Sequence, residues 1–134
     1  MNRTIYTLVM TLLLSATAPA LSAQASDYTG TWIGEATVPG TSDKDMVTLE
    51  LRKAENSYAG TISDSLNLVR DGAIREVILG ELGTLRFKFT LTRGNQEVTA
   101  KVTLDYIAGK LMGAWMIENG PYSPLDLSPQ KKTS

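Results

Sequence analysis

Side chains that commonly carry out catalysis or bind metal ions are scarce in this chain. It has no histidine and no cysteine, which removes the commonest general base, the commonest metal ligand and any thiolate nucleophile. Its Asp and Glu residues are spread among predicted turns and outward strand positions, so we expect no two carboxylates to face one pocket. No phosphate-binding loop or nucleophile motif occurs either. We therefore expect no enzymatic activity, no metal site and no cofactor.

The arginines offer a different chemistry, the binding of an anionic head group. Arg70, Arg75 and Arg93 fall near one end of the predicted fold, and a guanidinium group binds carboxylate or phosphate through paired hydrogen bonds. Acidic residues accompany them, so ordinary surface ion pairs are the alternative. The direction of Arg75 stays open, because either Arg75 or Glu76 could point inward.

Apolar residues in the same region could contact the apolar part of such a ligand. Residues 64–73 form a long link that carries Leu66 and Leu68 between polar neighbours. The link could act as a lid, or its leucines could pack over the end of the core, and these interpretations do not exclude each other. Long loops held by a rigid scaffold are common places for binding residues.

Regular alternation of apolar and polar residues predicts strands with one buried and one solvated face. Residues 85–92, LRFKFTLT, and residues 98–105, VTAKVTLD, show this pattern clearly. Turn residues separate such segments, and no convincing helical repeat occurs after residue 26. We predict an all-β fold with eight strands at about 29–38, 46–53, 57–63, 74–79, 84–92, 96–104, 110–117 and 122–127.

The short links between these strands favour an antiparallel up-and-down meander. Closing the meander into a barrel removes its exposed edges, and a flattened sandwich is the alternative. Alternate links of a meander lie at the same end of the barrel. The two longest links, 39–45 and 64–73, therefore share one end, which we call the mouth.

The inward face of the predicted barrel is apolar. Small residues share this face with large ones: Gly34, Ala36, Gly60, Ala100 and Gly113. They could leave room for an apolar ligand, or they could let the large side chains interdigitate in a filled core. The candidate cavity-lining residues are Trp32, Leu49, Tyr58, Phe87, Phe89, Val102 and Trp115.

The N-terminal segment predicts export. Arg3 precedes an apolar run at residues 5–14, and Ala23 and Ala25 form an A-x-A cleavage pattern. We predict a signal peptide at 1–25, a barrel at 26–128 and a polar tail at 129–134. The protein should be periplasmic or secreted with no stable membrane anchor. Its net charge of −1 argues against nucleic acid as a partner.

Several short motifs resemble those of the lipocalins and related calycin barrels. Gly30-Thr31-Trp32 resembles the G-x-W signature, whose tryptophan plugs the closed end of the lipocalin barrel, and Asp105-Tyr106 matches part of the T-D-Y motif. The resemblance implies that both motifs lie at the closed end. No arginine follows Arg93, however, whereas lipocalins place a late arginine on the tryptophan. The C-terminal helix of that family is also missing from the pattern.

A second resemblance is to the compact lipocalin-like barrel of secreted bacterial proteins, which often precedes a hydrolase domain. The shared motifs are Gly30-Thr31-Trp32-Ile33-Gly34, Pro39-Gly40, Gly60-Thr61-Ile62 and Gly113-Ala114-Trp115. Together the resemblances imply an eight-stranded, antiparallel, up-and-down lipocalin-like barrel.

We expect such a barrel to bind a small hydrophobic or amphipathic ligand through its mouth. The alternative is a protein-interaction module with a filled core, which would act as an accessory or inhibitor of another exported protein.

Overall fold

The computed structural model describes residues 27–130, so the predicted signal peptide at 1–25 lies outside the described residues, as do 131–134 of the predicted tail. The described part contains nine strands and no helix. The strands are β1 (Gly30–Thr37), β2 (Lys44–Ala54), β3 (Ser57–Asp64), β4 (Gly72–Ala73), β5 (Arg75–Leu79), β6 (Leu85–Arg93), β7 (Gln96–Ile107), β8 (Lys110–Ile117) and β9 (Tyr122–Pro129).

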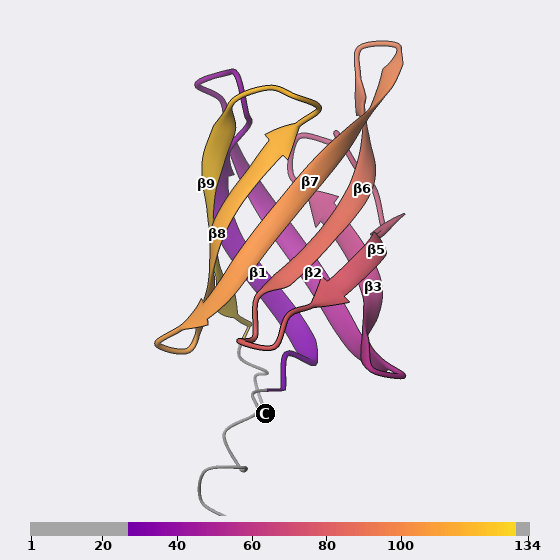
Figure 1. The fold of residues 1–134 in the computed structure, drawn as a ribbon. Helices are drawn as coiled ribbons and strands as arrows, with labels where there is room; N and C mark the ends of the chain where they lie inside the picture. Colours follow the sequence, from indigo (N-terminus) through magenta and orange to yellow (C-terminus); the bar gives the residue numbers. More distant parts are fainter. Residues whose placement is uncertain (1–26, 131–134) are drawn as a thin grey trace, which may run out of the picture.

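All nine strands belong to one antiparallel sheet that curls into a nearly closed barrel (Figure 1). Their order is β4-β3-β2-β1-β9-β8-β7-β6-β5, so β4 and β5 are the two edges. Only Ile74 separates these edge strands in the chain, which brings the edges of the sheet together. The predicted all-β antiparallel barrel is confirmed.

The predicted count of eight strands is wrong, because the chain changes partners at the seam of the barrel. β4 pairs with β3, whereas β5 pairs with β6. The backbone N of Ile74, between them, donates to Gly60 O at 3.1 Å. Alternation of side chains predicts a strand but does not reveal its neighbour in the sheet. The sequence pattern therefore predicts one strand where the structure has β4 and β5.

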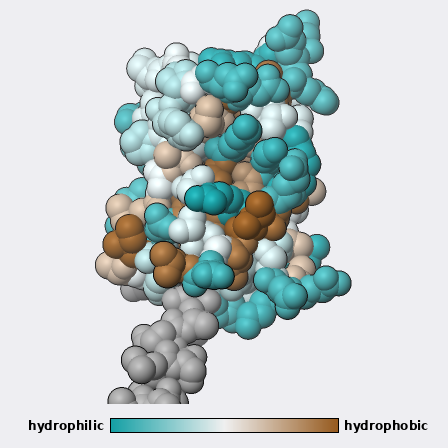
Figure 2. All heavy atoms as spheres, in the orientation of Figure 1, coloured by the Kyte–Doolittle hydropathy of each residue, from teal (hydrophilic) through white to brown (hydrophobic). Residues whose placement is uncertain are grey.

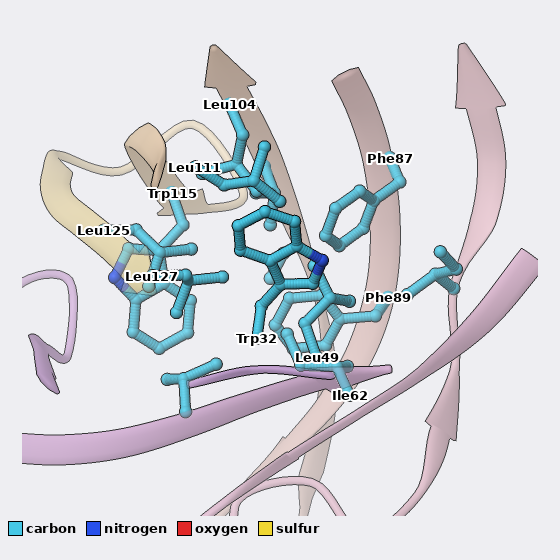
Figure 3. Packing of buried hydrophobic residues seen from close by; sticks show 14 of the residues in the cluster. Trp32, Leu49, Ile62, Phe87, Phe89, Leu104, Leu111, Trp115, Leu125 and Leu127 are labelled. Carbon is cyan, nitrogen blue, oxygen red and sulfur yellow. The ribbon is translucent and has the colours of Figure 1, made fainter. Parts of the chain in front are cut away.

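Inward side chains fill the barrel (Figure 3). The internal space beside Ile62, Phe89 and Trp115 measures about 10 Å³, which holds about one water molecule. The predicted cavity-lining residues are thus core residues that pack against one another. All seven are buried: Trp32, Leu49, Tyr58, Phe87, Phe89, Val102 and Trp115.

Three of the small inward residues, which could either leave internal space or let large side chains interdigitate, have a different role. A Cβ at Gly34, Gly60 or Gly113 would lie 1.8–1.9 Å from a backbone carbonyl oxygen of the neighbouring strand. These glycines therefore permit close approach of two backbones. They shape the barrel wall rather than a cavity.

Candidate functional site at the barrel mouth

Buried and partly buried hydrogen bonds close the lower end of the barrel in Figure 1, where β1 begins. The backbone N of Tyr28 donates to Tyr58 Oη at 2.8 Å, and the Tyr28 hydroxyl donates to Gly83 O at 2.9 Å. The indole Nε1 of Trp32 donates to Tyr28 O at 2.9 Å. These bonds join the start of β1 to β3 and to the β5–β6 turn, so this is the closed end.

Tyr106 brings the two lipocalin-like motifs together at the closed end. Its ring stacks on Tyr28 with 5.5 Å between ring centroids and meets Trp32 edge-on at 6.4 Å. The predicted placement of both motifs at this end is confirmed. No arginine follows Arg93 in the sequence, so the lipocalin pattern of a late arginine on the tryptophan is not met. Tyr106 contacts Trp32 in this chain.

The opposite end, the mouth, contains a pocket of about 250 Å³. Its most buried lining residues lie at or just beyond strand ends, namely Val38 after β1, Leu91 in β6 and Ile117 in β8. The β3–β4 loop contributes Leu66 and Leu68. The polar lining residues are Thr41, Asp43 and Arg93.

The mouth candidates predicted from sequence separate into two groups. Leu66, Leu68 and Arg93 line the mouth pocket together. Arg70 lies on the same loop as the leucines, but its Nε donates to Asn67 Oδ1 at 3.4 Å, and it is not among the pocket-lining residues.

Arg75 lies outside the mouth, which corrects the predicted cluster. Its guanidinium donates to Thr90 Oγ1 at 2.7 Å and to Thr99 Oγ1 at 3.2 Å, on the outer face of β6 and β7. A bulge causes this placement, because the β5–β6 register shifts after Arg75 and Glu76 has a φ of 51°. Both Arg75 and Glu76 are exposed, so neither points inward.

Two carboxylates share a small space beneath the mouth, so the prediction that no two would face one pocket is wrong. Asp45 lies in β2 and is only 2% exposed, and Asp64 ends β3. Both line the internal space of about 10 Å³. That volume leaves no room for a substrate.

One oxygen of each carboxylate holds the β3–β4 loop. Asp45 Oδ1 accepts from Ser65 N and Ser65 Oγ at 3.0 Å each and from Leu66 N at 3.3 Å. Asp64 Oδ1 accepts from Val69 N at 3.0 Å. The other oxygen of each residue, Oδ2, is buried without a hydrogen-bond partner.

Burial first, and then the neighbouring Asp64 carboxyl, raise the pKa of Asp45 from 3.8 to about 6. The hydrogen bonds from Ser65 act in the opposite direction without cancelling this effect.

The sequence does contain a signal for this carboxylate pair. Side chains two residues apart on a strand point to the same face. Asp45 therefore shares the inward face of Val47 and Leu49, and Asp64 shares that of Ile62. Val47 pairs with Asp64 across β2 and β3, so Asp45 is the diagonal neighbour of Asp64. Extending each strand by one or two residues toward the mouth predicts the pair.

A concavity of about 1080 Å³ lies near the closed end over β1–β3. Outward polar side chains such as Thr31, Glu50 and Thr61 line much of it. It is an open depression in the barrel wall and gathers no group of reactive residues.

Within residues 27–130, no three acidic, histidine or cysteine residues come together in a way that would hold a metal ion. No helix in this range is long and apolar enough to cross a membrane.

Comparison with protein-family models, curated proteins and solved structures gave no match to this chain.

Proposed function

We propose that this protein is an exported, lipocalin-like barrel that binds a small amphipathic molecule at its mouth and does not catalyse a reaction. The observation that carries the proposal is the mouth pocket, in which an apolar lining adjoins Thr41, Asp43 and Arg93. The signal-peptide pattern at 1–25 supports export, and the meeting of Trp32 with Tyr106 supports the lipocalin-like classification.

The sizes of the two spaces favour the mouth over the interior. The internal space is about 10 Å³, whereas the mouth pocket is about 250 Å³. Pockets for drug-sized ligands usually measure roughly 300–1,000 Å³. The ligand should therefore be a small molecule, such as a short acyl chain, that stays near the protein surface.

The lining of the mouth pocket favours a ligand with one apolar and one polar end. Val38, Leu91 and Ile117 are buried and offer apolar contact, whereas Arg93 is exposed and offers a positive charge. A carboxylate head group would pair with Arg93, and Thr41 would supply a hydroxyl. Asp43 disfavours a head group with more than one negative charge.

We expect octanoate to shift backbone amide NMR signals of residues that line the mouth, above all Leu66, Leu68 and Ile117. Arg93→Gln should weaken octanoate binding by roughly three- to tenfold, because a partly exposed charge pair contributes about 1 kcal/mol. The measurement is a titration followed by ¹H–¹⁵N correlation spectra at pH 6.

Two controls make this test specific. Arg86→Gln removes an exposed arginine from β6 outside the pocket and should leave octanoate binding unchanged. Octanol, which has the chain without the charge, should bind Arg93→Gln and the unaltered protein equally. Shifts scattered over the surface, or no shifts at millimolar octanoate, would contradict the proposed site.

A second candidate function, a protein-interaction module, is favoured by an apolar rim near the closed end. Figure 2 shows apolar residues gathered over the lower half of one face, whereas hydrophilic residues dominate its upper part. Leu82 is 99% exposed, and monomeric proteins seldom expose several large apolar side chains together. The residues of the apolar rim are Ile78, Leu79, Leu82, Tyr106 and Ile107.

Site-specific crosslinking in an exporting bacterium tests this second candidate. A photo-reactive residue at Leu82 should give one discrete crosslinked product, and the same residue at exposed Glu97 of β7 should give none. Equal or absent products at both positions would remove the rim as a docking surface.

A further inference from the structure

We infer that Asp45 and Asp64 share one proton, and that losing this proton loosens the β3–β4 loop that forms one side of the mouth pocket. The effect on the loop stands on the geometry of the pair and does not depend on the proposed function. The resulting effect on a ligand rests on the proposed function.

The hydrogen bonds of the pair leave one buried oxygen of each carboxylate available for a shared proton. Each carboxylate uses Oδ1 to hold the loop, and each keeps a buried Oδ2 without a partner. Carboxylates that are both ionised and close together in a buried site repel one another. A single proton between the two Oδ2 atoms removes one charge and gives both atoms a partner.

Among the described residues that line the space shared by the pair, none carries a positive charge. Around the shared space, β6 contributes Phe89 and Leu91, β8 contributes Trp115 and the loop contributes Leu68 and Val69, and none of these titrates. The residue of β1 that pairs with Asp45 is Ala36.

Charged residues near the pair in sequence or at the mouth are directed elsewhere. Lys44 Nζ donates to Thr37 Oγ1, Asp71 Oδ1 accepts from Ser63 Oγ, and Arg70 Nε donates to Asn67 Oδ1. Asp43 and Arg93 are exposed and line the mouth pocket rather than the space shared by the pair.

The pKa of Asp45, raised to about 6 chiefly by burial, places the loss of the proton in a mildly acidic range. Below that pH the pair carries one charge and the loop is held to β2 through Ser65 and Leu66. Above it, two charges oppose each other at the base of the loop. Because Leu66 and Leu68 line the mouth pocket, loosening of the loop changes the shape of the pocket.

Hydrogen exchange at the loop amides measures this effect directly and without a ligand. After correction for intrinsic exchange rates, protection of Leu66 and Val69 should fall by about tenfold or more between pH 5 and pH 7.5. The ¹³Cγ signal of Asp45 should titrate near pH 6. Protection that does not change with pH, or titration of Asp45 near pH 4, would overturn the inference.

The variant Asp45→Asn separates the proton from the shape of the side chain. Its amide oxygen can accept from Ser65 and Leu66, and its NH₂ group can donate to Asp64 in place of the shared proton. Loop protection should then stay high at both pH values. If this variant fails to fold, Asp64→Asn provides the same substitution from the other side. Retained pH dependence in a folded variant would contradict a shared proton.

A matched control and a stability measurement complete the test. Glu97→Gln removes an exposed carboxylate and should keep the pH dependence of the unaltered protein. Folding takes up a proton between pH 4 and pH 6, because the folded-state pKa of Asp45 exceeds its ordinary value. The urea midpoint of the unaltered protein should therefore fall as pH rises through this range, and that of Asp45→Asn should not.

Octanoate binding is then measured separately at pH 5 and pH 7.5. A loop that responds to pH without binding octanoate would support the proton site and remove support for the proposed ligand. Octanoate binding with no pH response in the loop would support the proposed ligand and overturn the proton site.

Discussion

Trp32→Ala should lower the free energy of unfolding by about 3–5 kcal/mol, the usual loss for a buried tryptophan truncated to alanine. Trp32 is 5% exposed, and its indole meets Tyr106 edge-on with 6.4 Å between ring centroids. The substitution leaves a cavity at the closed end. It also leaves Tyr28 O without the donor that Nε1 provides at 2.9 Å.

Urea denaturation followed by far-UV circular dichroism measures this loss. Leu82→Ala is the matched control, since Leu82 is apolar, lies near the same end and is 99% exposed. That control should change the free energy of unfolding by less than about 0.5 kcal/mol. Trp32→Phe should give an intermediate loss, because it keeps an aromatic ring without the hydrogen bond. Losses of less than 1 kcal/mol for Trp32→Ala would contradict a large contribution of its buried indole to the stability of the closed end.

Much of the barrel is predictable because alternation and turn chemistry are local properties of a chain. Residues 85–92 illustrate this, since Leu85, Phe87, Phe89 and Leu91 are all buried as their parity predicts. The seam is not predictable in this way. Local sequence does not reveal that Gly72 pairs with β3 whereas Arg75 pairs with β6. The positive φ of Glu76 also breaks the alternation, so that residues 75 and 76 both point outward.

Local sequence features likewise predict part of the candidate site, whereas contacts between residues distant in sequence decide the rest. Loop lengths placed 39–45 and 64–73 at one end, and the structure brings Thr41, Leu66 and Leu68 to one pocket there. Whether inward side chains fill a barrel depends on their packing in three dimensions, which parity cannot reveal. The inward direction of Asp45 and Asp64 is predictable once each predicted strand is extended toward the mouth, and the β2–β3 register, which sets Asp64 beside Val47, makes the two residues neighbours.

Gly60→Ala should be among the most destabilising small substitutions in the barrel, costing about 3 kcal/mol or more. A Cβ at this position would lie 1.8 Å from Glu50 O and 2.9 Å from Glu50 C. Both atoms belong to the backbone of β2, so no side chain can rotate away to make room. The neighbouring strands must separate where Gly60 pairs with Leu51.

The same substitution should also weaken the closure of the barrel, because Gly60 O accepts the backbone N–H of Ile74 between the two edge strands. Gly80→Ala is the matched control: a Cβ there has its nearest contact at 3.5 Å, an ordinary van der Waals distance. That control should be neutral or stabilise the fold by up to about 1 kcal/mol through the unfolded state. Urea denaturation of both variants separates the two interpretations of the barrel glycines. A glycine that merely left internal room would accept a methyl group, whereas one that lets β2 and β3 approach each other would not.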